Sequence, residues 1–190
     1  MAKPELITLP NPHLRSNSKK VGYIDQAILD LLEKMKLVTL DWEQSREHEV
    51  GVALAAVQID VPLRVVIIRN DFDNKQDKDF RVFINPVITK YEGEIVEDYE
   101  GCLSVKDLYG RVPRHSKIRV KAIDLTGEEV RITAEGFLAR VFQHEIDHTN
   151  GIVFIDRIKD SENSFYKLEN NGNLQQLNYE SEVKNNSFLW

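Results

Sequence analysis

Apolar residues recur at helical spacing in two stretches of the chain. In the first, from Ile24 to about Leu40, they fall three or four positions apart, and Asp25 stands near the start. This spacing predicts an amphipathic helix that begins close to a capping carboxylate and buries one face. A second pattern of the same kind begins near residues 134–136 and continues to His148. The sequence therefore predicts one helix before its central part and another after it.

Between these helical patterns the chain is rich in strand-forming residues. Some runs are β-branched or aromatic, and one alternates apolar with polar residues, as half-buried strands do. Polar residues 70–79 separate the first two runs, and Thr126-Gly127 marks a turn before the last. The predicted strands cover residues 63–68, 81–84, 118–122 and 130–132. Strands followed by one strong helix favour an α+β fold over alternating βαβ units.

The remaining segments are polar. Residues 41–50 are mostly charged and predict a surface loop. Residues 163–186 are rich in Asn, Gln and Glu, which predicts a weak helix followed by a flexible tail. We therefore expect a single domain over residues 1–160 and a polar helix or tail over residues 161–190.

Composition narrows the class of protein. The chain has 190 residues, a formal net charge of −6 and a single cysteine, and this length suffices for one domain with a substantial core. One cysteine cannot form an internal disulfide, and negative charge disfavours broad binding to nucleic acid or anionic lipid. No apolar run approaches the roughly 20 residues that span a bilayer, and the first residues lack a signal-peptide pattern. We expect a globular protein of the reducing cytoplasm.

The sharpest chemical feature is the segment His144-Glu145-Ile146-Asp147-His148 in the second predicted helix. Positions four residues apart share one face of a helix, so both imidazoles can reach the same metal ion. Glu145 follows the first imidazole, where its carboxylate can accept a proton from a bound water. The alternative is an amphipathic helix with two surface histidines, but the pattern favours a metal site.

A catalytic site of the zinc type usually has three protein ligands and one open position. One known arrangement places a third histidine six residues after the second, but that position is Phe154. Another arrangement uses a downstream glutamate, for which Glu162 and Glu169 are candidates in a polar segment. The remaining histidines, at positions 13, 48 and 115, are expected in surface loops without ligand-like spacing.

Cys102 is the strongest candidate for the third ligand. It stands in Glu100-Gly101-Cys102-Leu103-Ser104, after a strand-like stretch that ends at Tyr99. A free cysteine is often only a buried packing residue. The adjacent glycine, however, permits unusual backbone geometry and close approach, which suits a loop that carries a ligand.

A third feature is the run of small residues Gly51-Val52-Ala53-Leu54-Ala55-Ala56-Val57-Gln58, which ends in an amide donor. With Glu-Gly-Cys-Leu-Ser and the histidine motif preceded by Gln143, it resembles, in order and spacing, the three signature motifs of peptide deformylases. The similarity begins near Leu9-Pro10-Asn11-Pro12 and extends to Phe154-Ile155-Asp156-Arg157. It covers about the first 160 residues.

The resemblance implies a hydrolase that removes the formyl group from the N-terminal formylmethionine of newly synthesised polypeptides and releases formate. It implies an α+β fold in which mixed or antiparallel sheets pack around a central helix carrying the histidine motif. Cys102, His144 and His148 would hold Fe²⁺, for which Zn²⁺, Ni²⁺ or Co²⁺ can substitute. A thiolate ligand lowers the net charge of the centre, so an adjacent base becomes more important.

The resemblance also implies roles for individual residues. Glu145 would act as acid and base, while the Gln58 side-chain amide and the Leu103 backbone N–H would stabilise the oxyanion. The substrate peptide would lie as an added β-strand beside the small-residue run. Substrate contacts are expected from Gly51, Val52, Ala53, Glu100, Phe137 and Val141.

Several positions depart from the family pattern. Ala53 stands where a glycine is usual, and Val57 and Lys106 each replace a proline. Residues 41–50 look like an insertion beside the active site. Some relatives dock on the ribosome through a basic C-terminal helix, but the tail here is rich in glutamate, so this function is not carried over. We expect a monomer that acts on formylmethionyl peptides without direct contact to nucleic acid or membrane.

Two alternatives stay open. A metallopeptidase of the same motif class would use a glutamate, such as Glu169, as third ligand. A non-catalytic relative would keep the fold and the metal but only bind peptides, and Ala53 alone favours it. The intact Gln58, Cys102 and Glu145 favour the deformylase.

Overall fold

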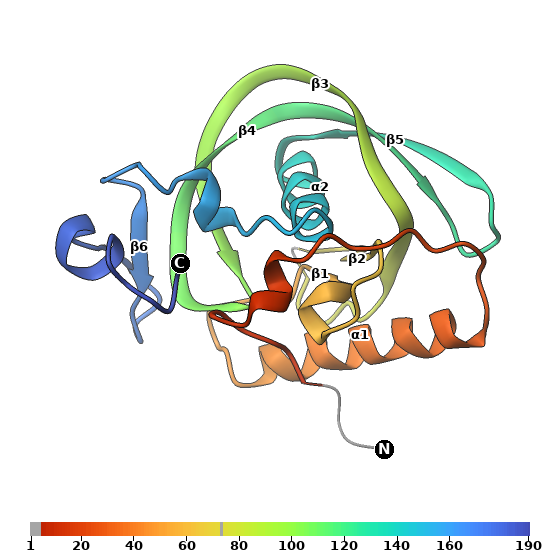
Figure 1. Cartoon of the computed structure of the whole chain (residues 1–190), viewed down its shortest axis with the longest axis horizontal. Coiled ribbons are helices and arrows are strands. Elements are labelled where there is room, and N and C mark those ends of the chain that lie inside the picture. The colour runs from red at the N-terminus through yellow and green to blue at the C-terminus, as the bar shows by residue number, and fades with distance from the viewer. Residues whose placement is uncertain (1–4, 73) are drawn as a thin grey trace.

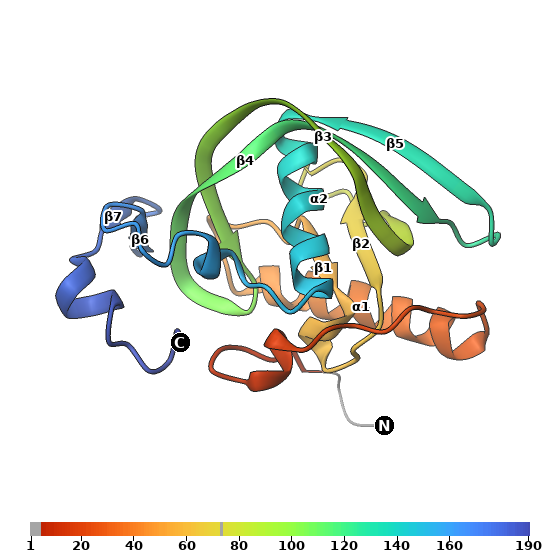
Figure 2. The same cartoon turned by 45° about the horizontal axis from the view of Figure 1, so that its top comes forward.

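A single helix, α2 (Gly136–Thr149), runs through the middle of the molecule, and an antiparallel sheet curves over it (Figures 1 and 2). The structure is a computed structural model that describes residues 5–72 and 74–190. The sheet order is β1-β2-β3-β4-β6-β7, and β5 pairs with β4. The strands are β1 (Ala53–Ala55), β2 (Val65–Arg69), β3 (Phe80–Cys102), β4 (Val105–Ile123), β5 (Glu129–Glu135), β6 (Phe165–Leu168) and β7 (Leu174–Gln176). The predicted α+β class is confirmed.

Helix α1 (Gln26–Gln44) packs against β1 and β2. Asp25 caps it as expected, because its side chain accepts a hydrogen bond from the Ile28 N–H at 3.1 Å. The helix continues through residues 41–44, so the predicted loop over residues 41–50 begins only after Gln44. The shorter helical segments are η1 (Pro12–Arg15), η2 (Ala56–Ile59), η3 (Phe154–Arg157) and η4 (Tyr179–Val183).

A buried ion pair explains why α1 continues beyond its predicted end near Leu40. Glu43 Oε2 lies 2.6 Å from Arg69 Nη2 of β2, and the Arg69 side chain is fully buried. The same carboxylate oxygen accepts the Gly51 N–H at 3.1 Å, and Arg69 Nε donates to the Gly51 carbonyl at 3.0 Å. A β-carbon at Gly51 would approach Thr39 Cγ2 to 2.5 Å, so only glycine allows this close contact. The pair therefore fixes the segment that leads into β1.

The two longest strands bend around α2. β3 and β4 pair from Ile84↔Ile123 to Cys102↔Val105, and their register shifts at four places. Such bulges twist and kink a strand, which lets a long pair curve over a helix. For this pair the sequence predicts strands only over residues 81–84 and 118–122, because several buried positions between them, such as Gly110 and Arg114, do not carry apolar side chains.

Helix α2 is buried on all sides from Ala139 to Thr149. Its apolar residues pack against the sheet, and the rings of Phe142 and Phe83 lie 4.8 Å apart between centroids. A helix surrounded in this way must satisfy its polar residues inside the protein, because an unpaired buried polar group is costly. The histidine motif therefore faces protein groups rather than bulk water.

The C-terminal region folds onto the body, so the expected weak helix and flexible tail are wrong. β6 pairs with β4 and β7 pairs with β6, which extends the sheet by a hairpin. Phe165 and Val183 are fully buried in the apolar cluster that contains Cys102. The Trp190 indole N–H donates to the Val183 carbonyl at 2.8 Å. These few apolar residues find partners on distant strands, which a local pattern does not reveal. The domain boundary at residue 160 stays a prediction.

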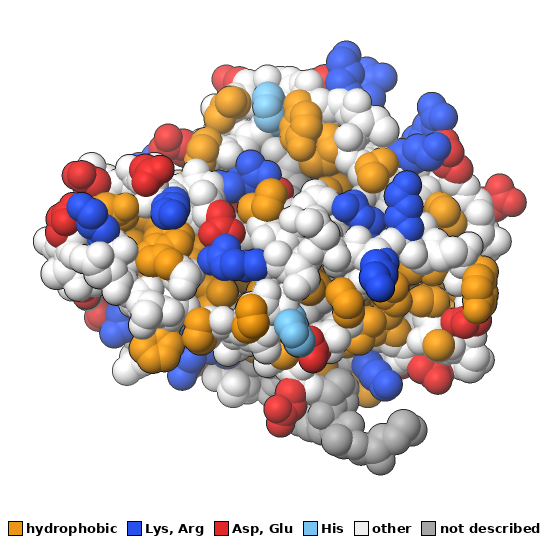
Figure 3. All heavy atoms as spheres, in the orientation of Figure 1, with side chains coloured by type: hydrophobic (Ala, Val, Ile, Leu, Met, Phe, Trp, Pro, Cys, Tyr) orange, Lys and Arg blue, Asp and Glu red, His pale blue; other side chains and the backbone are white. Residues whose placement is uncertain are grey.

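In the described part of the chain, no helix is long and apolar enough to cross a membrane. On the face drawn in Figure 3, basic and acidic side chains are interspersed, with hydrophobic side chains in small groups between them.

Replacing Glu43 by alanine leaves Arg69 buried without its carboxylate. We expect the free energy of unfolding to fall by about 3–5 kcal/mol, because an uncompensated buried charge is costly. Urea denaturation followed by circular dichroism measures the change. Glu33→Ala is the matched control, since it removes an exposed partner of Lys36 and should cost less than about 1 kcal/mol. Equal losses for both variants would contradict the role of the buried pair.

Candidate metal centre

Three side chains with metal-ligating atoms meet where the end of β3 reaches α2. Cys102 is the last residue of β3, and His144 and His148 lie one turn apart on α2, as their spacing predicts. Their candidate donor atoms all lie within 4.8 Å of one another, and Cys102 Sγ is 3.3 Å from His148 Nε2. All three residues are buried.

This cluster has the donor set and the size that a divalent ion requires. Thiolate and imidazole bind Zn²⁺ at about 2.3 and 2.0–2.1 Å, so the donors of a tetrahedral site lie about 3.3–3.7 Å apart. The contact between Cys102 and His148 is of this length. Three protein donors would leave the fourth position open, as in catalytic sites.

The two histidines differ in their electrostatic surroundings. Burial, together with nearby positive charge, lowers the pKa of His148 well below its usual value. Its imidazole therefore stays neutral, which is the form that binds a metal. Burial also acts to lower the pKa of His144, but hydrogen bonds with Cys102 and Glu100 raise it well above its usual value. The surroundings of His144 thus favour a positive charge, whether a proton or a metal ion.

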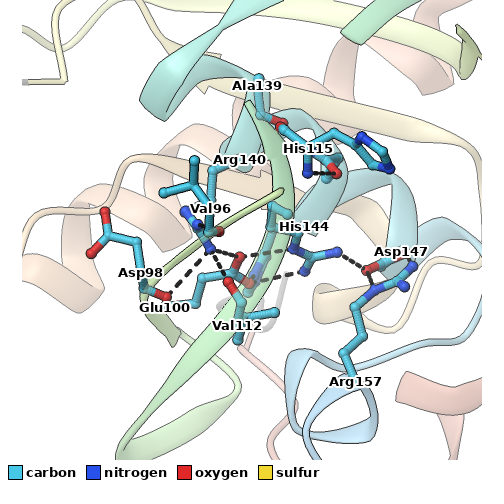
Figure 4. Close-up of polar contacts among 12 residues, drawn as sticks. Val96, Asp98, Glu100, Val112, His115, Ala139, Arg140, His144, Asp147 and Arg157 are labelled. Atoms are coloured by element: carbon cyan, nitrogen blue, oxygen red, sulfur yellow. Dashed lines mark hydrogen bonds and ion pairs between the residues drawn. The ribbon is translucent and has the colours of Figure 1, made fainter. Parts of the chain in front are cut away.

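Glu100 orients His144 (Figure 4). Its Oε2 lies 3.0 Å from His144 Nδ1, which leaves Nε2 as the ring nitrogen available to an ion. The carboxylate also accepts two hydrogen bonds from Arg114, at 2.8 and 2.9 Å, and one from Arg140 at 2.8 Å. Burial acts to raise the pKa of Glu100, but hydrogen bonds from Arg114 and His144 hold it well below its usual range. A carboxylate held in this way fixes the ring orientation of a metal ligand.

Asp147 extends this network on the other side of Arg114. It accepts a hydrogen bond from Arg114 Nη1 at 2.5 Å and forms an ion pair with Arg157 of η3. Arg140 also donates to backbone carbonyls of β3 and β4, at Val96 and Val112. Three arginines thus compensate two buried carboxylates and tie α2 to its surroundings. Nothing in the spacing of these arginines along the chain indicates this role.

Glu145 and Gln58 line the same cavity as the cluster. Glu145 is buried, and its Oε2 has no hydrogen-bond partner among the described residues. Burial raises the pKa of Glu145 to about 7. Gln58 Oε1 accepts the Ala55 N–H at 2.9 Å, whereas Nε2 donates to Ser104 Oγ at 3.1 Å and lies 3.6 Å from Cys102 Sγ. The amide donor therefore faces the cluster.

The cavity next to the cluster has a volume of about 250 Å³. The residues named from the sequence that line it include Val52, Ala53, Leu103, Phe137 and Val141. Ala53 lies in the extended strand β1, so the alanine in place of glycine carries no backbone strain.

Two residues expected to contact substrate are placed differently. Gly51 is not among the lining residues, because its backbone groups are bound by Glu43 and Arg69. Glu100 lies in the wall, but its carboxylate is occupied by His144 and the two arginines. Its carboxylate faces His144 and the arginines, and a contact of Glu100 with substrate stays a prediction.

The wall also contains residues that the motifs do not include. Trp42, His48, Glu49 and Val50 belong to the segment that looks like an insertion in the sequence, and Tyr99, Tyr109 and Arg140 complete this group. In the sequence, only the apparent insertion of residues 41–50 beside the active site indicated that the first four of these residues could line the cavity.

The other candidates for metal ligation lie elsewhere. His13 is exposed on η1, and His48 is exposed in the loop after α1, as expected. His115 is half-buried within β4, which corrects its expected place in a surface loop. Among the described residues, neither Glu162 nor Glu169 belongs to the ligand cluster.

A buried Cys-His-His cluster, an adjacent glutamate and an open cavity define a metal-dependent hydrolase, and comparison with known proteins gives its family. The family model described as polypeptide deformylase matches residues 3–164. A peptide deformylase from Thermomicrobium roseum is 40% identical over 84% of this chain and 88% of its own length. One from Halothermothrix orenii is 43% identical over 78% of this chain and 88% of its own length.

Solved structures agree with this result. A crystal structure of a peptide deformylase from Legionella pneumophila is 40% identical, has a TM-score of 0.72 and covers 82% of this chain and 86% of its own. The actinonin complex of a peptide deformylase from Synechococcus elongatus is 33% identical, with a TM-score of 0.71 and coverage of 83% and 82%. The chain belongs to the polypeptide deformylase family. It is an enzyme, a metal-dependent hydrolase that removes N-terminal formyl groups from polypeptides.

Replacing Glu100 by glutamine removes the negative charge behind His144 and preserves the side-chain size. We expect metal affinity to fall about 10–100-fold, because this carboxylate orients a ligand and compensates two arginines. Competition with a chelator of known affinity measures the change. Glu97→Gln, at an exposed position of the same strand, is the control and should leave the affinity unchanged. An unchanged affinity for Glu100→Gln would rule out the orienting role.

Proposed function

We propose that this enzyme acts on the N-formylmethionine of newly synthesised polypeptides and that the residues around the Cys-His-His cluster carry out the reaction. The observation that carries this proposal is the cluster of Cys102, His144 and His148 next to a cavity that Glu145 and Gln58 line. The three cluster residues are buried, and Glu100 orients the ring of His144, so the cluster is prepared to hold an ion.

Cys102, His144 and His148 would hold one divalent ion, which we assign as Fe²⁺, with Zn²⁺, Ni²⁺ or Co²⁺ as substitutes. When bound, such an ion supplies Lewis-acid activation of water and of the formyl oxygen. Glu145 Oε2 is buried without a hydrogen-bond partner among the described residues, which supports a polar ligand next to the cluster, whichever of these ions is bound.

Glu145 moves the protons. Its carboxylate accepts a proton as water attacks the formyl carbon, and it then delivers that proton to the departing methionine amine. A group used twice in this way works best when its pKa lies near the working pH. Burial raises the pKa of Glu145 to about 7, which meets this condition.

Gln58 and Leu103 stabilise the negative oxygen that develops during attack. The hydrogen bond from the Ala55 N–H to Gln58 Oε1 holds the amide so that its Nε2 faces the cluster. The Leu103 backbone N–H follows directly after Cys102 and is the second donor we assign. One preorganised donor of this type is typically worth about 3–4 kcal/mol in the transition state.

The substrate peptide would add to the free edge of β1, which is the end strand of the sheet. Val52 and Ala53 would supply the backbone contacts. Phe137 and Val141, on one side of α2, would border the methionine side chain, and both line the cavity.

The thiolate ligand also bears on the cellular compartment in which the reaction takes place. A thiolate ligand is preserved in a reducing compartment, so we place the enzyme in the cytoplasm. We expect a monomer that does not bind nucleic acid directly. The C-terminal region, which is acidic and folded against the body through Phe165 and Val183, is not assigned to ribosome docking.

The central test is formate release from formyl-Met-Ala. We expect Glu145→Gln to retain metal but to lose about 10²–10⁴-fold in kcat, because glutamine cannot transfer the protons. Glu128→Gln, in the exposed turn between β4 and β5, should keep full activity. Full activity of Glu145→Gln would remove Glu145 from the mechanism, and tight peptide binding without turnover by the wild type would favour a non-catalytic relative.

The ligand set is tested on protein purified without oxygen. We expect the wild type and Glu169→Ala to contain iron and to release formate, whereas Cys102→Ala should lose both metal and activity. Metal analysis by mass spectrometry together with the formate assay measures this. The reverse pattern, with metal lost only in Glu169→Ala, would support the metallopeptidase alternative.

A further inference from the structure

A second, polar cavity adjoins the catalytic one and has a volume of about 720 Å³. We call it the outer groove. Its walls come from residues 45–49 after α1, from Lys106 and Asp107 at the start of β4, and from residues 167–171 of the C-terminal hairpin. His48 and Glu49 line both cavities, so the outer groove continues directly from the catalytic cavity.

Two ion pairs and a hydrogen bond hold the residues around Glu49 between the two cavities, which we call the rim. Arg46 Nη1 lies 2.7 Å from Glu49 Oε2 and 2.9 Å from Asp107 Oδ1. The Tyr109 hydroxyl donates to Glu49 Oε1 at 2.9 Å, which ties the same rim to β4. A rim held by ion pairs and by the hydroxyl of the half-buried Tyr109 is preformed, so a ligand does not have to order it.

The turn of the C-terminal hairpin also rests on this rim. Gly172 has φ +82°, and a β-carbon at this position would lie 3.1 Å from His48 Cγ. Glycine is the residue that adopts this backbone conformation without strain. The hairpin thus lies directly beside the segment that looks like an insertion in the sequence.

The backbone of β1 sets the direction in which a bound peptide must run. The Val52 carbonyl accepts the Arg69 N–H at 2.8 Å, so Val52 faces β2. Neighbouring residues of an antiparallel strand turn their backbone groups to opposite sides, and Ala53 therefore presents its N–H and C=O to the free edge.

The metal cluster lies at the other end of this edge. Gln58 follows β1 in η2 and lies 3.6 Å from Cys102 Sγ. A peptide with its formyl group at the cluster and its backbone paired with Ala53 therefore runs antiparallel to β1, past Val52 and toward Glu49. Its downstream residues therefore pass His48 and Glu49, which line both cavities, and enter the outer groove.

We propose that the outer groove binds the downstream part of the nascent polypeptide and thereby favours long substrates over short formyl peptides. This inference rests on the proposed function. Within the described part of the chain, no hydrogen bond or ion pair occupies the side chains of Glu47, Lys106, Lys167 and Glu169, so charges of both signs are available to a polar segment.

The contacts in the outer groove lie far from the reacting atoms. They bind the ground state and the transition state equally, so they should lower KM without changing kcat. We expect a formyl-Met nonapeptide with polar residues at positions five to nine to have a KM about 5–10-fold below that of a tripeptide with the same first three residues.

Formate release from both peptides is compared in the wild type and in three variants. Asn170→Trp fills the outer groove from the hairpin turn and should raise the KM of the nonapeptide to that of the tripeptide, with tripeptide kinetics unchanged. Lys106→Ala/Lys167→Ala should give a smaller change in the same direction. Asn185→Trp, at an exposed position outside the groove, is the matched control and should behave as wild type.

Equal KM values for the two peptides in the wild type, with normal turnover, would overturn the outer-groove proposal and leave the proposed function intact. Equal KM values of Asn170→Trp and Asn185→Trp for the nonapeptide would also overturn the outer-groove proposal and leave the proposed function intact. No turnover of either peptide would remove the proposed function and the outer-groove proposal together.

Discussion

The site depends on one buried carboxylate, that of Glu100. It is shielded from water, and its two oxygens contact Arg114, Arg140 and His144. A buried charge is tolerated only when partners compensate it, so the strands that carry Glu100 and Arg114 and the helix that carries His144 must adopt one relative position. The imidazole orientation needed to hold an ion is a consequence of this charge balance.

A second buried pair, between Glu43 and Arg69, places the opposite wall of the cavity. It holds Gly51 against α1 and so determines where β1 begins. The apolar clusters between the sheet and the two helices supply most of the area removed from water. That burial is not directional, however, and the hydrogen-bonded ion pairs decide the positions of the side chains that line the cavity.

The segments that depart most from the motif pattern meet at one place. Residues 45–49 and the hairpin of residues 165–176 are far apart in the chain, yet His48 lies against Gly172. Both segments lie outside the three motifs. Residues 48 and 49 line the catalytic cavity and the outer groove, whereas the hairpin lines the outer groove. The motifs thus contain the residues assigned to the chemistry, whereas these two segments form walls of the outer groove.

The local pattern of apolar and polar residues was sufficient to predict features that depend on residues only a few positions apart. Helical spacing placed His144 and His148 on one face, and Asp25 at the start of α1, because a helix is held by contacts within one turn. The segment around Cys102 made it a candidate for the third ligand, and the resemblance to the family implied that role. The length of β3 and β4, the C-terminal hairpin, and the arginines around Glu100 depended on the tertiary structure. Strand pairing and compensation of buried charge join residues that are far apart in the chain, and their partners exist only once the topology has formed.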